Sequence, residues 1–373
     1  MFQVARNILV TGTNRGIGFG LVKELVKLNP SPGHIFATCR NPAGPESKAL
    51  QNFATQHDNT YVVQLDTTDL SSIRRAVSEV ESHLKGQGLN LLINNAARNS
   101  QALFLENVDQ EDMLSSYKTN AVGPLLVVKT ALNMVNACLA EELKKDGIAC
   151  VLLHPGWVKT DMGSEQTLNE LASKYSNIHI IQLEVEDQSS VKAAASVVES
   201  LLHGKGLNLL INNAGVNSYA TLETVEQQEM LSAFNTNVVG PILVVKEFLP
   251  LLKKAARAAT MKEMSCQRAA IINITSKLAS IERGFEVMKG PMYPYRASKA
   301  ALNMVTVCFA LELKEEGILC TVIHPGWVKT DMGTEQAPVT VQNSVRGILN
   351  VLANLSSASN GAFLDWEGNA LPW

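Results

Sequence analysis

The sequence predicts an α/β fold, built on a doubly wound parallel sheet with helices on both faces. Short apolar runs of strand length alternate with longer segments of helical periodicity along most of the chain. Several of these runs are apolar at every position, as is usual for parallel strands that are covered on both faces. A glycine-rich turn, Thr11–Gly18, also joins the first expected strand to the first expected helix.

The expected elements follow one another in a regular order. Strands are predicted at Asn7–Val10, His34–Thr38, Tyr61–Leu65, Leu89–Ile93, Ala149–Leu153, Ile178–Leu183, Leu207–Ile211, Ala269–Ile274, Leu319–Ile323 and Ala362–Leu364. Helical patterns lie between many of them, at Leu21–Leu28, Ser71–Lys85, Ser189–His203 and Ala300–Glu316. Such alternation favours parallel strands joined by crossover helices.

Parts of the sequence occur twice. The decapeptide HPGWVKTDMG stands at His154–Gly163 and again at His324–Gly333, and Gly88–Ala96 recurs without change as Gly206–Ala214. The first copy, residues 1–166, lacks a counterpart of Glu247–Lys299. The second copy, residues 167–373, lacks a counterpart of residues 1–49. We therefore predict a partially duplicated sheet in which each copy lacks what the other has.

Composition limits the classes of function. The chain has 373 residues with a formal net charge of −3, so it offers no broad basic surface for nucleic acid or anionic lipid. Its 6 cysteines show no short regular spacing, and we expect reduced thiols and no metal site. No apolar run approaches the roughly 20 residues that span a bilayer, and we expect a cytoplasmic protein without a signal peptide.

The glycine-rich turn predicts a nucleotide site. Small residues at a strand-to-helix turn let the backbone approach a pyrophosphate, while the helix N-terminus offers free N–H donors. A site that prefers NAD places an acidic residue about 20 residues further on, but Leu25–Pro45 contains no Asp or Glu. Arg40 follows the second strand and Arg15 lies inside the turn, so two guanidinium groups could hold a 2′-phosphate. We expect NADPH/NADP⁺ as the cofactor.

A second set of residues predicts proton-transfer chemistry. Ser276 follows a strand, while Tyr295 and Lys299 stand four apart at the start of a helix and so share one face. Carbonyl reduction places negative charge on an oxygen, which needs a proton donor. A lysine ammonium about 4 Å from a phenol can lower the phenol pKa by about 3 units at an effective dielectric of about 20. We therefore expect Lys299 to activate Tyr295.

Together these motifs resemble the short-chain dehydrogenase/reductase family, which has a Rossmann-type fold. The resemblance rests on TGxxxGxG at Thr11–Gly18, NNAG at Asn212–Gly215, YxxxK at Tyr295–Lys299 and the Pro325-Gly326 pair. In detail the sequence is similar to the C-factor and sniffer group of NADPH-dependent carbonyl reductases. One departure is Ala97, which stands where the family pattern has Gly.

The resemblance implies roles for particular residues. Tyr295 would be the acid, Lys299 its activator and a ribose contact, Ser276 the hydroxyl that orients the carbonyl, and Asn237 a support for a proton relay. Asp66 would read the adenine, and Pro325, Gly326 and Val328 would cradle the nicotinamide. The full implied cofactor set is Gly12, Arg15, Gly16, Ile17, Gly18, Arg40, Asp66, Asn94, Asn212, Pro325, Gly326, Val328 and Thr330.

The duplication leaves two functional hypotheses open. In the first, residues 1–129 complement residues 247–373, and the chain is an NADPH-dependent reductase of small aldehydes or ketones. In the second, the first copy closes on itself, and the chain is a non-catalytic NADPH-binding or interaction protein. The first decapeptide is expected to be a structural vestige in either case, because the Ser–Tyr–Lys segment is missing upstream of it. Homo-oligomers are a further possibility, since members of the family commonly form them.

Overall fold

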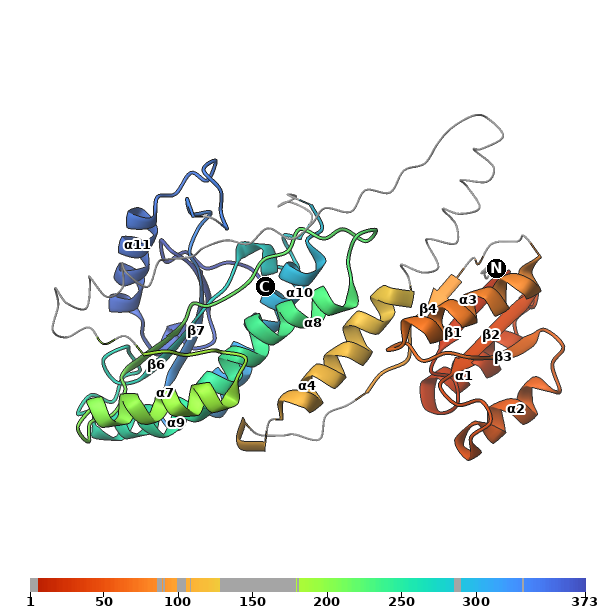
Figure 1. The fold of residues 1–373 in the computed structure, drawn as a ribbon, viewed down its shortest axis with the longest axis horizontal. Helices are drawn as coiled ribbons and strands as arrows, with labels where there is room; N and C mark the ends of the chain where they lie inside the picture. The colour runs from red at the N-terminus through yellow and green to blue at the C-terminus, as the bar shows by residue number, and fades with distance from the viewer. Residues whose placement is uncertain are drawn as a thin grey trace. The chain divides into compact units, whose positions relative to one another are not determined.

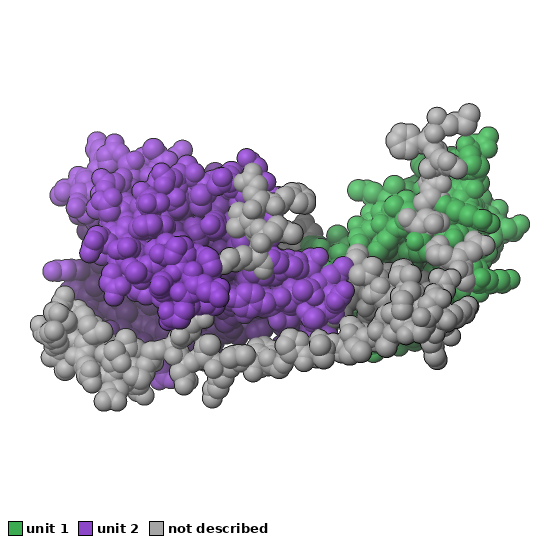
Figure 2. Space-filling view, turned by 90° about the horizontal axis from the view of Figure 1, so that it is seen from above, with its two compact units in different colours: residues 1–101, 111–154 green, residues 102–110, 155–373 purple. Residues whose placement is uncertain are grey.

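The fold was analysed in a computed structural model, which describes residues 6–85, 89, 91–98, 105–107, 109–127, 179, 181–284, 290–330 and 332–373. The chain divides into two compact units, shown in different colours in Figure 2. Unit 1 comprises residues 1–101 and 111–154, and unit 2 comprises residues 102–110 and 155–373. Each unit contains a four-stranded parallel sheet flanked by helices (Figure 1).

The sheet of unit 1 has the order β3-β2-β1-β4. Its central strand β1 (Asn7–Thr11) is buried along its whole length, and it pairs with β2 (His34–Cys39) and β4 (Leu91–Ile93). Strand β3 (Thr60–Gln64) forms one edge. All pairings are parallel, so the carboxyl ends of the strands lie together at one edge of the sheet.

Helices connect the strands of unit 1, and the first of them begins five residues before the predicted start at Leu21. Helix α1 (Gly16–Val26) follows β1, α2 (Lys48–Ala54) follows a short 3₁₀ turn at Pro45–Ser47, and α3 (Leu70–Leu84) follows β3. The side chain of Asp69 caps α3 by accepting a hydrogen bond of 2.9 Å from the Ser71 amide. The chain continues through α4 (Gln110–Tyr117), which leads into a π-helical turn, η3 (Lys118–Val122).

The sheet of unit 2 has the order β5-β6-β7-β8 and is also parallel. Its strands are β5 (Leu209–Asn212), β6 (Ala270–Ile274), β7 (Leu319–His324) and β8 (Phe363–Asp365). Its helices are α7 (Gln188–Leu201), α8 (Gln227–Phe234), α9 (Gly240–Ala258), α10 (Tyr293–Glu312) and α11 (Val341–Asn354), with a π-helical turn η4 (Asn235–Val239) between α8 and α9.

Two apolar clusters cover the two faces of this second sheet. Val191 of α7 packs with Phe248 of α9 in one cluster, against which Leu210 of β5 lies. In the other cluster Ile272 and Ile323 pack with Val351 of α11. The doubly wound arrangement that the sequence predicts is thus present, because α7 and α9 cover one face and α11 covers the other.

Matching segments of the two units adopt matching structures. Asp187 caps α7 through the Ser189 amide at 2.9 Å, as Asp69 caps α3 through Ser71. The π-helical turns η3 and η4 also correspond in sequence. The repeated residues therefore specify the same local geometry in both settings.

Two expectations were wrong in detail. The strand predicted at Ile178–Leu183 is not formed over residues 181–183, because unit 2 has no counterpart of β1 and β2 with which such a strand would pair. The helix predicted at Ala300–Glu316 begins earlier, at Tyr293, and ends at Glu312. The expected strand Ala149–Leu153, the decapeptide His154–Gly163 and the predicted boundary at residues 166–167 lie outside the described residues.

Among the helices that the structure describes, none is long and apolar enough to cross a membrane. Within the same residues, no group of three or more His, Cys, Asp or Glu side chains is placed to hold a metal ion.

Candidate functional site

The glycine-rich turn of unit 1 joins β1 to α1. Gly12 and Gly16 have φ values of +68° and +55°, which favour glycine because they lie in the left-handed region. A Cβ on Gly18 would lie 2.2 Å from the carbonyl oxygen of Gly12, so no side chain fits there. A Cβ on Gly16 would meet no atom within 4 Å. The backbone at Gly16 is therefore open to an incoming group at the N-terminus of α1.

Asn95 and Thr11 hold this turn in place. The Asn95 amide Nδ2 donates to the carbonyl oxygens of Thr11 and Gly12, at 2.9 and 3.0 Å. The Thr11 hydroxyl accepts from the backbone amides of Asn95 and Ala96, at 2.9 and 3.0 Å. Sequence reasoning chose Asn94, which is exposed, and missed these two residues. The sequence feature that could have identified Asn95 is the pair of adjacent asparagines, Asn94 and Asn95, after the strand.

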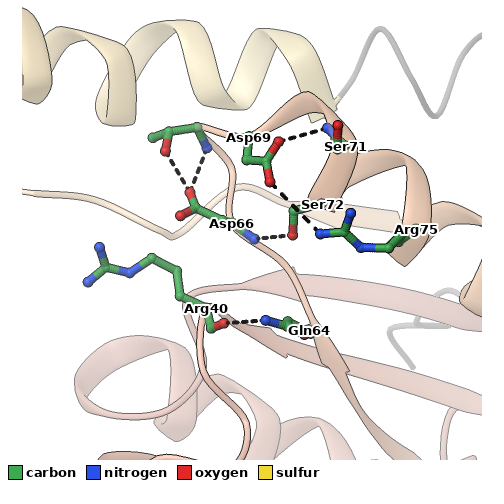
Figure 3. Close-up of polar contacts among 8 residues, drawn as sticks. Arg40, Gln64, Asp66, Asp69, Ser71, Ser72 and Arg75 are labelled. Atoms are coloured by element: carbon green, nitrogen blue, oxygen red, sulfur yellow. Dashed lines mark hydrogen bonds and ion pairs between the residues drawn. The ribbon is translucent and has the colours of Figure 1, made fainter.

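The two arginines expected at the phosphate end are both exposed, as is Ile17 at the start of α1. Arg40 lies directly after β2, and its carbonyl oxygen accepts a hydrogen bond of 3.1 Å from the Gln64 amide. Figure 3 shows its side chain extending away from the strand. Neither Arg15 nor Arg40 takes part in an ion pair within the described residues, so both guanidinium groups are available to an anion.

Asp66 follows β3 and is held by its own loop (Figure 3). Its Oδ1 accepts hydrogen bonds from the amide and the hydroxyl of Thr68, at 2.8 and 2.7 Å. Its backbone amide donates to the Ser72 hydroxyl at 2.9 Å. The carboxylate is thus fixed in orientation at the carboxyl edge of the sheet, two strands away from the glycine turn.

Unit 2 brings the predicted catalytic side chains together. Ser276 follows β6 and is buried, and its side chain lies close enough to the phenol of Tyr295, in the first turn of α10, to act on the pKa of that phenol. Lys299 lies one turn further along α10 and is 5% exposed. Its Nζ donates a hydrogen bond of 3.0 Å to the carbonyl oxygen of Ile274. The end of β6 therefore positions both the hydroxyl and the ammonium group.

Burial dominates the acid–base properties of this group. Burial raises the pKa of Tyr295, and the hydrogen bond from Ser276 opposes this change. Burial lowers the pKa of Lys299 to about 8. The pKa of Tyr295 is therefore shifted in the direction opposite to the expected one, because burial of the phenol is the largest cause of the shift.

Asn237 connects the π-helical turn η4 to helix α10. Its Oδ1 accepts from the Val216 amide at 2.8 Å, and its Nδ2 donates to the Val216 carbonyl and to the Ser298 hydroxyl, each at 2.9 Å. Ser298 in turn donates to the Tyr295 carbonyl at 2.9 Å. Asn237 thus fixes the loop after β5 against the first turn of α10.

Gly215 lies where these groups converge. A Cβ on Gly215 would lie 2.9 Å from Asn237 Oδ1 and 3.1 Å from Lys299 Nζ. In unit 1 the corresponding position is Ala97, and Asn120 there binds the Arg98 backbone at 2.7 Å through both its amide oxygen and nitrogen. Both units therefore contain this asparagine clamp, in which the side-chain amide binds the backbone N–H and C=O of one residue. Unit 1 has no counterpart of Lys299, because the first copy lacks the segment that would carry it.

The loop after β7 is held from several sides. The Ser344 hydroxyl donates to the Pro325 carbonyl at 2.6 Å, and Gly326 has a φ of +88°. A Cβ on Gly326 would lie 3.1 Å from the indole of Trp366. Val328 forms a parallel β-bridge with Val339, so the loop after β7 lies alongside the segment that contains Val339. The Thr330 hydroxyl accepts from the Gly333 amide at 3.1 Å, so it supports the turn of the decapeptide.

Three further residues complete the description of unit 2. The Asn212 amide donates to Asn273 Oδ1 at 2.8 Å, so its side chain joins β5 to β6. Tyr219 lies close enough to Tyr295 to raise the pKa of that phenol, and sequence reasoning missed it because no motif includes it. Burial lowers the pKa of His324 to about 4.

The predicted site residues thus form two groups. Gly12, Arg15, Gly16, Ile17, Gly18, Arg40, Asp66 and Asn94 belong to unit 1, and Asn212, Asn237, Ser276, Tyr295, Lys299, Pro325, Gly326, Val328 and Thr330 belong to unit 2. A glycine turn at the first strand of a parallel sheet, and a Ser–Tyr–Lys group made by a strand end and the helix α10, define the class of α/β nucleotide-dependent oxidoreductases.

Comparison with known proteins identifies the family within this class. The sequence matches the short chain dehydrogenase family over residues 6–137 and 163–339, and the chain belongs to this family of oxidoreductases, whose members use nicotinamide cofactors. It is 36% identical over 168 residues to the C-signal protein of Myxococcus xanthus, covering 45% of this chain and 93% of that protein.

Two other similar proteins cover more of the chain. An uncharacterized oxidoreductase of Schizosaccharomyces pombe is 30% identical over 228 residues, covering 57% of this chain and 84% of the relative. The NADPH-bound carbonyl reductase from chicken fatty liver is 32% identical in sequence with a TM-score of 0.50, covering 99% of this chain and 94% of that structure.

Proposed function

We propose that this chain is an NADPH-dependent reductase of small aldehydes and ketones. The observation that carries the proposal is that the buried Ser276 side chain lies beside the Tyr295 phenol, with Lys299 one helical turn away and also buried. The similarity to an NADPH-bound carbonyl reductase supports the same cofactor and reaction type.

The residues of unit 1 fit the phosphate end of NADPH. The open backbone at Gly16 suits a pyrophosphate at the N-terminus of α1. Arg15 and Arg40 are exposed cations without ion pairs in the described residues, as a 2′-phosphate requires. Asp66, fixed by Thr68, would accept from the adenine amino group.

The residues of unit 2 fit the reacting end. NADPH, when bound, supplies the hydride that adds to the carbonyl carbon. Ser276 donates a hydrogen bond to the carbonyl oxygen and orients it, and Tyr295 donates its phenolic proton to that oxygen as charge develops there. Lys299 stabilises the resulting phenolate, which water then reprotonates. Asn237 and Ser298 keep the first turn of α10 in register with the loop after β5.

A second candidate is a non-catalytic NADPH-binding protein. The observation that favours it is that the glycine turn and Tyr295 belong to different compact units. Both candidates predict NADPH binding, so binding does not separate them. Reduction requires that one nucleotide contact both groups of residues, and turnover is therefore the decisive property.

The test is NADPH oxidation by the full chain with an aromatic aldehyde or a quinone. We expect turnover that falls by at least about a hundredfold in Tyr295→Phe, as removal of a general acid typically does. Tyr293→Phe, two residues earlier on the same helix, is the matched control and should keep its rate. Folded, NADPH-saturated protein that turns over no carbonyl substrate would reject the reductase in favour of the second candidate.

A further inference from the structure

Arg296 stands next to Tyr295 in the first turn of α10 and takes no part in the proposed proton transfer. Its Nε donates a hydrogen bond of 3.2 Å to the carbonyl oxygen of Leu278, and its Nη2 donates one of 3.0 Å to the carbonyl oxygen of Gly284. One planar guanidinium group therefore binds both ends of residues 278–284. It holds this segment as a turn against the start of α10.

The turn follows directly from Ser276, which caps the short 3₁₀ helix η5 (Lys277–Ala279). The Ser276 Oγ accepts a hydrogen bond of 3.2 Å from the Leu278 amide. Leu278 thus binds Ser276 through its N–H and Arg296 through its C=O. A restraint on the backbone of Leu278 is therefore also a restraint on the position of the Ser276 hydroxyl.

The contact with Leu278 also determines what the Ser276 hydroxyl can do. A hydroxyl carries one O–H donor and two acceptor positions, and its hydrogen rotates to suit its surroundings. The Leu278 amide occupies an acceptor position, so the O–H remains available as a donor. Ser276 is buried beside the Tyr295 phenol, where the proposed reaction needs a donor to the carbonyl oxygen. A donor that is already in place needs no reorganisation during the reaction.

A second set of contacts holds the middle of the turn. The carbonyl oxygen of Trp373 accepts from the Glu282 amide at 2.8 Å and from the Ser280 hydroxyl at 3.2 Å. These hydrogen bonds do not involve Arg296, so we expect the turn to stay close to α10 when the guanidinium group is removed. The part of the turn that adjoins Ser276 would then lose its own restraint.

We propose that Arg296 is a positioning residue, which holds the backbone of Leu278 so that the Ser276 hydroxyl stays in place as the donor to the substrate carbonyl. Arg296 acts through Ser276 and needs no contact with substrate or cofactor. The effect on turnover rests on the proposed reductase function, but the restraint on Leu278 does not. Loss of Arg296 should therefore be visible both in the reaction and in the backbone.

A double-mutant cycle tests whether Arg296 acts through Ser276. Arg296→Met keeps an unbranched apolar stem and removes the donors, and we expect kcat for an aromatic aldehyde to fall about tenfold while KM changes less. In the Ser276→Ala background the same substitution should change kcat by less than about twofold, because the hydroxyl that Arg296 positions is absent. An equal loss in both backgrounds would overturn the proposal.

Two further variants control this cycle. Arg346→Met, at an exposed position of α11, removes a positive charge from the same unit and should keep its kcat. Arg296→Lys keeps the charge, but its single ammonium group does not span both carbonyl oxygens, so its loss of kcat should be smaller than that of Arg296→Met. Far-UV circular dichroism checks the fold, and Arg296→Lys takes the place of Arg296→Met in the cycle if the latter does not fold.

Hydrogen exchange of the Leu278 amide, followed by NMR, gives a result without turnover. We expect this exchange to be at least about tenfold faster in Arg296→Met and in Ser276→Ala, and Arg296→Met to add little in the Ser276→Ala background. Unchanged exchange in Arg296→Met would overturn the proposal in an active or an inactive chain. Coupled exchange in a chain that reduces no carbonyl substrate would support the link from Arg296 to Ser276 and reject the proposed reductase function.

Discussion

The amide Nδ2 of Asn237 donates a hydrogen bond of 2.9 Å to the hydroxyl of Ser298, inside unit 2 and away from solvent. This single contact joins the π-helical turn η4 to helix α10. Ser298 occupies one of the unspecified positions of the YxxxK motif at Tyr295–Lys299, and its hydroxyl also donates to the carbonyl of Tyr295. The orientation of the phenol thus depends on a serine that takes no part in the chemistry.

Replacing this serine tests its positioning role. Ser298→Ala leaves one buried N–H of Asn237 without an acceptor, which costs about 1–3 kcal/mol. We expect the free energy of unfolding in urea to fall by that amount and kcat to fall more than KM changes. Ser196→Ala, at an exposed serine that binds only within α7, should leave both unchanged. Equal stability of the two variants would contradict the role.

Gly215 and Ala97 offer a matched pair of substitutions. A methyl group at Gly215 would press on Asn237 Oδ1 and Lys299 Nζ, at 2.9 and 3.1 Å. We expect Gly215→Ala to destabilise the chain by about 1–3 kcal/mol in urea unfolding and to reduce turnover. The reverse change, Ala97→Gly, should leave turnover unchanged, because unit 1 has no counterpart of Lys299. Full activity of Gly215→Ala would show that the crowding is relieved without consequence.

Stability should depend on pH through Lys299. Burial lowers its pKa from 10.5 in the unfolded chain to about 8 in the folded chain. Between these values the unfolded state binds more protons, so the free energy of unfolding should rise with pH above 8, by at most about 1.4 kcal/mol per unit. Urea unfolding at pH 7.5, 8.5 and 9.5 measures this rise, which Lys299→Met should abolish. An equal rise in that variant would assign the effect to other groups.

Cofactor preference should depend on Arg40. The unmodified chain should bind NADPH more tightly than NADH, since a charge-assisted hydrogen bond to the 2′-phosphate contributes about 1.5–3 kcal/mol. Arg40→Asp should weaken NADPH binding about tenfold to a hundredfold in a fluorescence titration, and it should leave NADH binding less affected. Arg74→Asp, at an exposed position on α3, is the control for net charge. Equal affinity of the unmodified chain for both nucleotides would contradict this assignment.

Much of the fold could be predicted because each strand is a short apolar run with a recognisable boundary. Strand β1, predicted at Asn7–Val10, extends by one residue to Thr11, and β7 ends one residue later than expected, at His324. The strand expected near Ile181 failed for a reason that a local pattern does not contain. A strand needs a neighbour, and the neighbour's absence from unit 2 follows from the topology.

The candidate site was likewise only partly predictable from the sequence. Ser276, Tyr295 and Lys299 could be found because their spacing is local or follows a strand end, and the structure brings them together. Ser298 and Asn95 could not be assigned, since their partners Asn237 and Gly12 lie far away in the sequence. The direction of the Tyr295 pKa was also missed, because burial depends on the whole unit rather than on its nearest charge.

The asparagine clamps of the two units bear on how the sequences of related proteins are interpreted. Asn120 holds Arg98 in unit 1 by the same two hydrogen bonds through which Asn237 holds Val216, although the first copy lacks the segment that carries Tyr295. These asparagine–backbone hydrogen bonds are therefore structural, since unit 1 keeps them without the Ser–Tyr–Lys segment. In a related protein that has lost part of its sequence, an asparagine at this turn would therefore indicate that the fold is kept. A tyrosine at the position of Tyr295 would be the better indication of catalysis.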